Sequence, residues 1–197
     1  MKPNLWQCRI FFLALLVSPI CWAGIGDEGT LADSLVFTFL PGSGTGSAIV
    51  TSKVYQASEE SNYRGFYIYT YLISDATVNL SVFSAEILPN AVIGAYGWDA
   101  DGKAPLSWEP VRNSSEGPIE SFDAFFNITV KPGETSATLW FISPQGPTQE
   151  DGALAGITGG SYNFLVGKIL TPIPEPTTCL LLAAGGLLSR FSRKRKL

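Results

Sequence analysis

Three acidic residues around a glycine form the first arrangement in the chain that could bind a ligand. Asp99 and Asp101 precede Gly102, and Glu109 follows. An Asp-x-Asp-Gly run can open a calcium-binding loop. The EF-hand spacing fails, because a loop with Gly102 at its sixth position would start on a glycine and end on Trp108. We interpret the segment as an Asp-Gly turn between strands and expect no metal site.

Three tyrosines alternate along a second segment and would share one face of a strand: Tyr67, Tyr69 and Tyr71. A row of tyrosines can stack on sugar rings, or it can pack within a sheet and turn its hydroxyls toward solvent. We favour the packing interpretation, because large aromatic side chains are more often buried than presented to a ligand. The later tryptophans are expected in the core for the same reason: Trp98, Trp108 and Trp140.

Several carboxylates in the middle of the chain invite comparison with a glycosidase: Glu59, Glu60, Glu116, Glu120 and Asp123. Such an enzyme needs two carboxyl groups at a fixed separation, which the sequence does not set. The chain contains no histidine, so Ser-His-Asp and Cys-His catalytic sets are excluded. We expect no catalytic residues and no cofactor, and we interpret the scattered acids as a solvated face.

The elements that must position these residues are strands, because hydrophobicity in the middle of the chain alternates with a period of two. β-Branched and aromatic residues fill eight such segments. They are 34–40, 48–55, 65–74, 78–88, 91–98, 122–130, 136–143 and 162–170. Pro- and Gly-rich residues 144–161 are expected to form a long loop. The sequence therefore predicts an all-β fold, a β-sandwich of about eight antiparallel strands over residues 24–171.

Charge and cysteine usage narrow the function of this domain. Residues 24–172 hold six Lys and Arg against sixteen Asp and Glu, a net charge of −10. Such a surface repels nucleic acid and anionic lipid, whereas neutral glycans and divalent cations remain compatible with it. The three cysteines, Cys8, Cys21 and Cys179, lie in the terminal segments. The domain between them therefore contains no disulfide.

The N-terminal 23 residues have the order of a secretory signal peptide. Lys2 and Arg9 supply positive charge, residues 10–17 form an unbroken apolar run, and small residues precede position 24. We predict a signal helix over residues 1–23 that is cleaved between Ala23 and Gly24. The protein is thus expected to be exported.

The C-terminal segment, residues 172–197, has three parts. Pro174, Glu175 and Pro176 form a stiff, extended spacer. A short apolar helix is expected next: Cys179, Leu180, Leu181, Leu182, Ala183, Ala184, Gly185, Gly186, Leu187 and Leu188. A basic end follows: Arg190, Arg193, Lys194, Arg195 and Lys196. The apolar part is shorter than the roughly 17 residues that a lone span needs, so the cations must help by reaching to the headgroups. Basic residues stay on the cytoplasmic side, which leaves the domain outside.

This tripartite tail resembles the PEP-CTERM sorting signal, and the resemblance covers about 25 residues. It implies that Pro174, Glu175 and Pro176 are the recognition motif, that Cys179 to Leu188 are the membrane segment, and that Arg190 to Lys196 are the stop-transfer end. It further implies processing by an exosortase, a membrane protease-transpeptidase of Gram-negative bacteria that make exopolysaccharide. The protein would be anchored transiently in the inner membrane and then reach the cell surface or the extracellular matrix.

These features leave three hypotheses for the domain. The first is a non-catalytic surface or matrix component that is sorted through its tail. The second is a glycan-binding module for the exopolysaccharide. The third is a secreted hydrolase, which would need two carboxylates facing each other across a cleft.

Overall fold

The computed structural model describes residues 29–112 and 117–173, and this part of the chain consists of strands, turns and loops without a helix. The predicted all-β class is confirmed. Ten strands follow one another along the chain: β1 (Gly29–Ser43), β2 (Ala48–Ala57), β3 (Tyr67–Ser74), β4 (Leu80–Glu86), β5 (Tyr96–Trp98), β6 (Ser107–Arg112), β7 (Ile119–Val130), β8 (Leu139–Ser143), β9 (Pro147–Thr158) and β10 (Ser161–Pro172).

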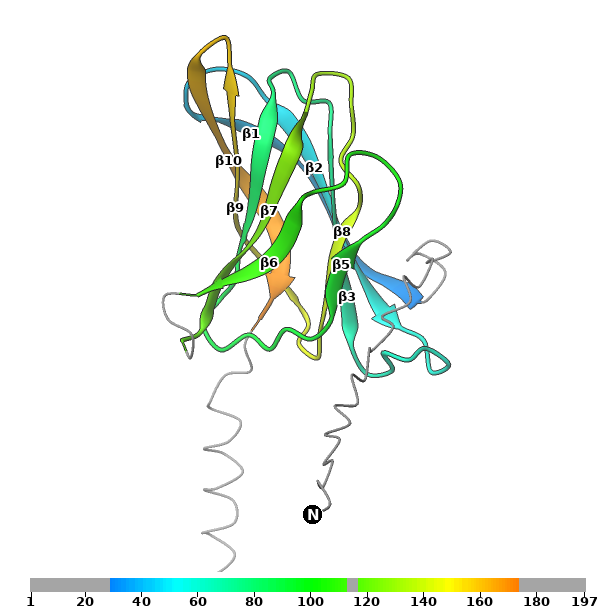
Figure 1. The fold of residues 1–197 in the computed structure, drawn as a ribbon. Helices are drawn as coiled ribbons and strands as arrows, with labels where there is room; N and C mark the ends of the chain where they lie inside the picture. The colour runs from blue at the N-terminus through cyan, green and yellow to red at the C-terminus, as the bar shows by residue number, and fades with distance from the viewer. Residues whose placement is uncertain (1–28, 113–116, 174–197) are drawn as a thin grey trace, which may run out of the picture.

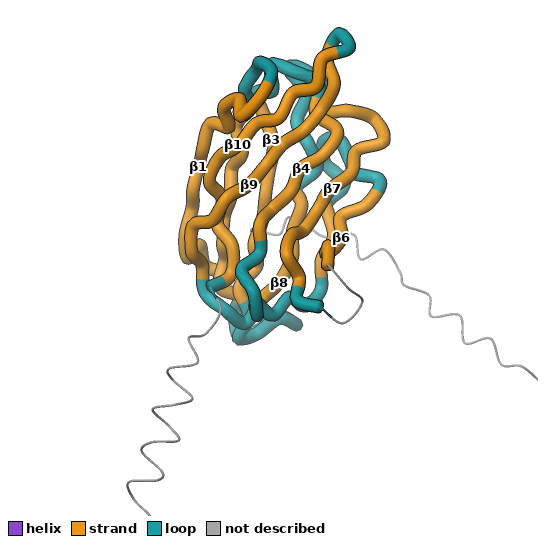
Figure 2. The backbone as a smooth tube through the Cα atoms, turned by 90° about the vertical axis from the view of Figure 1, so that its left-hand side faces the viewer, coloured by secondary structure: helices purple, strands orange, loops and turns teal. Residues whose placement is uncertain are grey.

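All ten strands belong to one antiparallel sheet with the order β5-β8-β3-β2-β1-β10-β9-β4-β7-β6 (Figure 1). The first half-sheet contains β5, β8, β3, β2 and β1, and the second contains β10, β9, β4, β7 and β6. Figure 2 shows the second half-sheet from its outer side. The two half-sheets are joined by strand pairing where Leu40, Pro41 and Ser43 of β1 pair with residues 164–166 of β10. Beyond that junction β1 and β10 separate, so the two halves can face each other across a core.

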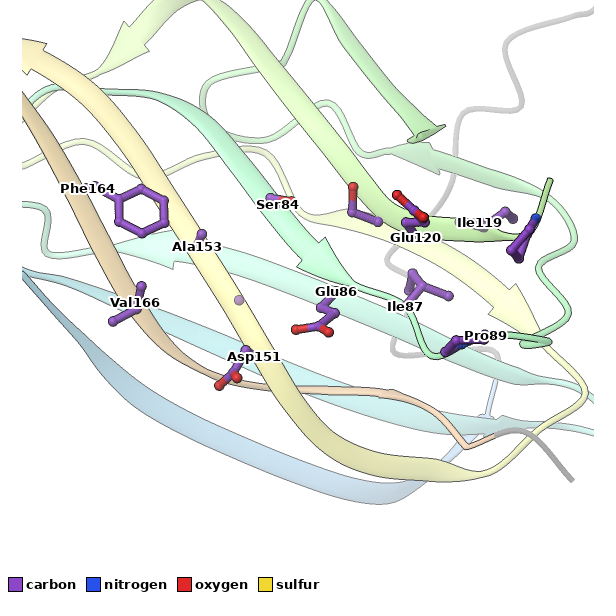
Figure 3. A pocket seen from close by; sticks show the side chains of 13 residues that line it. Ser84, Glu86, Ile87, Pro89, Ile119, Glu120, Asp151, Ala153, Phe164 and Val166 are labelled. Carbon is purple, nitrogen blue, oxygen red and sulfur yellow. The ribbon is translucent and has the colours of Figure 1, made fainter. Parts of the chain in front are cut away.

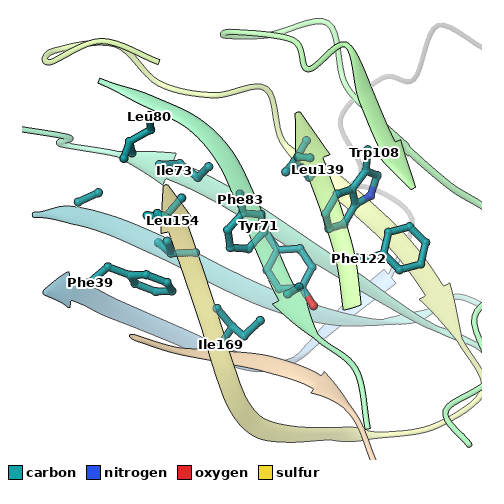
Figure 4. Close-up of a cluster of buried hydrophobic side chains, with 14 of the residues drawn as sticks. Phe39, Tyr71, Ile73, Leu80, Phe83, Trp108, Phe122, Leu139, Leu154 and Ile169 are labelled. Atoms are coloured by element: carbon teal, nitrogen blue, oxygen red, sulfur yellow. The ribbon is translucent and has the colours of Figure 1, made fainter. Parts of the chain in front are cut away.

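The core between the halves combines aromatic and aliphatic side chains (Figure 4). Tyr71 of β3 lies 5.5 Å, ring centre to ring centre, from Phe83 of β4, and Trp108 of β6 lies 4.8 Å from Phe122 of β7. All four side chains are at most 1% exposed. Burying aromatic side chains of this size from both halves stabilises the folded sheet by several kcal/mol in order of magnitude.

The two end strands of the sheet approach each other, so the sheet is nearly closed. Tyr96 of β5 packs edge-on against Phe122 of β7, with 5.1 Å between ring centres. Trp108 of β6 donates a hydrogen bond from Nε1 to the carbonyl oxygen of Trp140 on β8, at 2.9 Å. Side chains rather than a strand ladder thus connect the two ends.

The predicted eight-stranded sandwich is wrong in its strand count and in its separate sheets. The eight expected segments correspond to strands, although residues 91–98 contribute only the short β5. β6 and β9 were not expected. Residues 147–158, predicted to lie in a loop, form the twelve-residue β9 and turn back into β10 at Gly159 and Gly160.

The physical reason for the missing β9 is its inward face. Gly152, Leu154 and Gly156 point into the core, so two of the three inward positions lack a side chain. Phe39 from β1 fills the space instead. A Cβ on Gly152 would lie 3.1 Å from Cζ of Phe39, and a Cβ on Gly167 of β10 would overlap the same ring. Glycine is needed here for the close approach of that ring, and it removes the alternation of hydrophobic side chains.

The predicted signal helix and the short C-terminal helix lie outside the described residues. Among residues 29–112 and 117–173 there is no helix with the length and apolar character to cross a membrane.

Candidate functional site

A concave surface on the outer side of the second half-sheet is the candidate site (Figure 3). It encloses about 770 Å³ and is open to solvent. We call it the outer-face hollow. Strands β4, β9 and β10 supply its floor, and the segments around Pro89 and Pro118 supply one rim. Apart from the buried Ile87 and Ile119, the side chains that line it face solvent at least in part.

Strand register explains which side chains share this surface. Direct register partners cross the half-sheet in one row of outward-facing residues: Leu40, Val166, Ala153, Ser84, Asp123 and Glu109. Opposite residues in neighbouring strands have side chains on the same face. The row is therefore apolar at β1 and β10 and acidic at β7 and β6.

A parallel row beside it is apolar along its whole length. Phe164 of β10, Ala155 of β9, Val82 of β4 and Phe125 of β7 are successive register partners. Phe125 is 41% exposed. The two phenylalanines are three strand spacings apart, or about 14 Å. Small side chains between them leave a flat strip with an aromatic ring near each end.

Carboxylates and hydroxyls border the strip on the side of the first row. Ser84 donates a hydrogen bond to Oδ1 of Asp123 at 2.6 Å. Lys168 Nζ lies 2.6 Å from Oδ1 of Asp151 and donates a hydrogen bond to it, which raises the pKa of the Lys168 ammonium group. Glu86 is exposed at the edge of β4, where the outer-face hollow begins. The surface is thus rich in hydrogen-bond acceptors and carries an excess of negative charge.

This combination suits an uncharged polyhydroxylated ligand. The apolar faces of sugar rings can cover the flat strip, because aromatic and apolar surfaces attract them through the hydrophobic effect and dispersion. Sugar hydroxyls can donate hydrogen bonds to the carboxylates, and bonds to charged acceptors are stronger than neutral ones. Anionic polymers are repelled by the same carboxylates.

The tyrosine row lies elsewhere and is structural. Tyr69 and Tyr71 are fully buried, and their hydroxyls donate hydrogen bonds of 2.7 Å to the carbonyl oxygens of Gln145 and Leu170. Burial raises the pKa of both phenols well above the usual value near 10. The packing interpretation is confirmed for these two residues, although their hydroxyls point to backbone carbonyls and not to solvent. Tyr67 is half-buried.

The three predicted core tryptophans differ in their exposure. Trp108 and Trp140 are buried, at 1% and 7% exposed. The prediction is wrong for Trp98, which is 41% exposed because β5 is the end strand of the sheet. An end strand has a neighbour on one side only, so its core-facing side chains stay partly in solvent.

The acidic residues around Gly102 do not converge on one point. Asp99 accepts a hydrogen bond from the backbone N–H of Thr138 at 2.8 Å, as a turn carboxylate does. Glu109 pairs in register with Asp123 on the outer face instead. In the described part of the chain, no group of three His, Cys, Asp or Glu side chains could hold a metal ion.

The remaining acidic candidates separate into two groups. Glu59 forms an exposed ion pair with Arg64 at 3.5 Å, in the connection between β2 and β3 of the first half-sheet. Glu120 and Asp123 lie in or beside the outer-face hollow, while Glu116 falls outside the described residues. Glu60 is exposed.

Sequence reasoning missed most of the hollow. It did not identify five residues that line the hollow, or the phenylalanine at the far end of the apolar strip: Ser84, Glu86, Asp151, Phe164 and Val166, and Phe125. These residues are up to 82 positions apart in the sequence, and only the strand order brings them together. The one available signal was their alternation with core residues.

The tail follows β10 directly. All the residues predicted for cleavage, sorting, membrane insertion and stop transfer lie outside the described part of the chain. No curated protein and no solved structure matches the chain. Residues 172–196, however, match the family model of the PEP-CTERM protein-sorting motif. The chain therefore ends in a PEP-CTERM sorting signal, which implies a protein that is exported, anchored in the membrane before processing, and sorted by an exosortase.

Proposed function

We propose that this protein is a non-catalytic surface or matrix protein whose exported domain binds the exopolysaccharide through the outer-face hollow. The observation that carries the proposal is the flat apolar strip from Phe164 to Phe125 beside a border of acceptors. The sorting signal supports it, because exosortase processing would deliver the domain to a cell surface where such a polymer is expected.

The form of the surface favours a polymer over a small molecule. Pockets for small molecules bury most of their ligand in an enclosed cleft. The outer-face hollow is instead a shallow concavity across four strands, and the strip runs about 14 Å from β10 to β7. A chain of sugars can lie along it and leave at both ends.

The carboxylates of the hollow act as hydrogen-bond acceptors in this proposal. A glycosidase acid is normally held in an apolar enclosure that keeps it protonated. Glu86 and Glu120 are exposed to solvent, Asp123 accepts a hydrogen bond from Ser84, and Asp151 pairs with Lys168. These environments support binding rather than bond cleavage.

The test is a binding titration of the full-length protein with the exopolysaccharide of its host. Phe164→Ala should weaken binding by about two- to tenfold, because one aromatic contact contributes about 0.5–1.5 kcal/mol. Tyr162→Ala is the matched control. Tyr162 lies two residues away on β10, is 59% exposed, and does not line the hollow. Equal binding by both variants, or no binding by the parent protein, would contradict the proposal.

A separate measurement tests whether the protein is non-catalytic. The protein is incubated with the same polysaccharide, and new reducing ends are counted. We expect none above background. Release of reducing ends that Glu86→Gln or Glu120→Gln abolishes would show that the hollow is an active site.

A further inference from the structure

The chain leaves the folded domain at a fixed point. β10 keeps its register with β9 up to its last residue, where Pro172 pairs with Pro147. The backbone N–H of Ile173 then donates a hydrogen bond of 2.9 Å to the carbonyl oxygen of Gly146. Pro174, the first residue of the predicted recognition motif, comes next in the sequence. The motif therefore begins directly after the last residue that the fold holds.

A buried glutamine ties this exit to a neighbouring loop. Gln145 is 9% exposed, and its side-chain Oε1 accepts a hydrogen bond of 2.8 Å from the backbone N–H of Val92. Its carbonyl oxygen accepts a hydrogen bond of 2.7 Å from the hydroxyl of Tyr69. Because Gly146 follows Gln145 in the chain, one support holds both Val92 and Ile173. We call the surface of residues 88–93, 143–147 and 173 the exit platform.

The exit platform is apolar and uncharged. Val92 is 54% and Ile173 is 47% exposed. The platform contains no Asp, Glu, Lys or Arg, although residues 24–172 as a whole have a net charge of −10. The centres of protein–protein interfaces are depleted of charged residues in the same way. The composition of the platform is therefore that of a contact surface.

A concave surface beside Val92 gives the platform a shape that a partner can enter. It encloses about 540 Å³ and is open to solvent. Residues 90–93 line one side of it. The other side is formed where β6 ends and β7 begins, by Arg112, Gly117, Pro118 and Ile119. A protruding side chain of a partner can therefore be seated next to Val92.

The length of chain beyond the platform limits what can meet it. Residues 174–178 separate Ile173 from the predicted membrane segment, which starts at Cys179. An extended chain advances by at most about 3.5 Å per residue, so this connection covers about 20 Å. Before processing, the platform would therefore lie within about 20 Å of the predicted membrane segment.

An enzyme that binds the motif in this space also reaches the platform. Three extended residues, 174–176, span about 10 Å at most. Even a domain of about 100 residues has a radius of gyration of about 13 Å, so an enzyme that encloses the motif extends past it in both directions. In one direction it meets the membrane, and in the other it meets Ile173 and Val92.

We propose that the exosortase docks on the exit platform while it binds Pro174, Glu175 and Pro176. Val92 and Ile173 lose their exposed surface to the enzyme, and the hydrophobic effect stabilises this contact. The motif identifies the substrate, whereas the platform adds affinity and places the motif. The proposal rests on exosortase processing, which the sorting signal implies, and is independent of polysaccharide binding.

The test follows processing of the full-length protein in a host with an exosortase. A pulse of labelled protein is chased, and the conversion of the full-length form into the processed form is timed. Val92→Lys should slow this conversion by about threefold or more, because a charge replaces an apolar side chain that is buried on docking. Ile157→Lys is the matched control and should keep the parent rate. Ile157 is 61% exposed and pairs with Tyr162 at the opposite end of β10.

A spacer tests the link between platform and motif. A flexible insertion of about six Gly and Ser residues between Ile173 and Pro174 should also slow processing, because docking then no longer places the motif. In the chain with the spacer, Val92→Lys should have a smaller effect than in the parent chain, since the two changes disturb one arrangement. Melting temperatures check that all variants are folded.

Three results would overturn the proposal. The first is processing of Val92→Lys at the parent rate. The second is a spacer that leaves processing unchanged or makes it faster. The third comes from a host without an exosortase: if Val92→Lys is retained there less well than the parent protein, the platform binds lipid instead. Alanines at 174–176 test the motif separately, and if they too are processed at the parent rate, the tail is not recognised through this motif.

Discussion

Replacing Tyr71 by Phe tests whether the tyrosine row supports the core. The Tyr71 side chain is fully buried, and its hydroxyl lies 2.7 Å from the carbonyl oxygen of Leu170. The Phe variant leaves that buried acceptor without this donor, which costs about 2 kcal/mol of unfolding free energy. For a domain of this size the melting temperature should fall by about 4–8 °C. Tyr67→Phe is the control, because Tyr67 is half-buried and its variant should change stability by under about 0.5 kcal/mol.

The same variant has a pH signature with a defined sign. Burial raises the pKa of Tyr69 and Tyr71 in the folded protein, whereas in the unfolded chain both phenols titrate near 10. Stability from these groups is therefore complete below about pH 10 and falls above it, because the unfolded state then binds fewer protons. Each tyrosine contributes a slope of about 1.4 kcal/mol per pH unit.

Urea unfolding at pH 7, 10 and 11 measures both effects. The parent protein should lose stability above pH 10 about twice as steeply as Tyr71→Phe, counting the two buried phenols alone. The 2 kcal/mol gap at pH 7 should thus close between about pH 11 and pH 12. A gap of constant size from pH 7 to pH 11 would refute the reasoning, because Tyr71 would then not be held as a buried neutral phenol.

Three further outcomes are expected. Gly167→Ala should destabilise the domain by about 1–3 kcal/mol, because the added Cβ would overlap the ring of Phe39. Adding Phe39→Leu should recover part of this loss, which thermal melts of the single and double variants would measure. In a host with an exosortase, truncation before Arg190 should leave the protein exported but poorly retained in the membrane. Alanines at 174–176 should instead leave it anchored at full length in the inner membrane. If both variants fractionate like the wild-type protein, the proposed role of the tail is wrong. Calcium should not raise the melting temperature, and a rise that Asp101→Ala abolishes would contradict this expectation.

The fold class was predictable because hydrophobic and polar residues alternate along most of the strands. β3 and β10 carry large side chains on their inward faces, so a period of two is visible. β9 lacks this signal because its inward-facing Gly152 has no side chain and Phe39 of β1 occupies the space there. β6 was not predicted because it contains Pro110. Proline is tolerated in an end strand such as β6 but not in a central strand, so its presence argues against a strand.

The sorting signal could be predicted from the sequence, whereas the outer-face hollow could not. The sorting signal is local, so a short stretch of residues contains the whole pattern. The outer-face hollow depends on β9 lying between β4 and β10 and on the register of each pair. Ser84 and Ala153 become neighbours across 69 positions of chain, and no periodicity within one strand can predict such a pairing. The acids Glu120 and Asp123 were noticed as types, but their surroundings came from the sheet.

The junction between domain and tail has a mechanical consequence. The match to the sorting motif begins at Pro172, which is also the last residue of β10, so only residues 173–178 lie between the folded domain and the predicted membrane segment. A pull on the anchor in the direction of β10 would act nearly perpendicular to the hydrogen bonds of the twelve residue pairs that join this strand to β9. Hydrogen bonds loaded in this shear geometry share the force instead of opening one at a time. Phe164 and Val166 of the same strand line the outer-face hollow, so tension between a bound polymer and the membrane would be carried by one strand and its ladder.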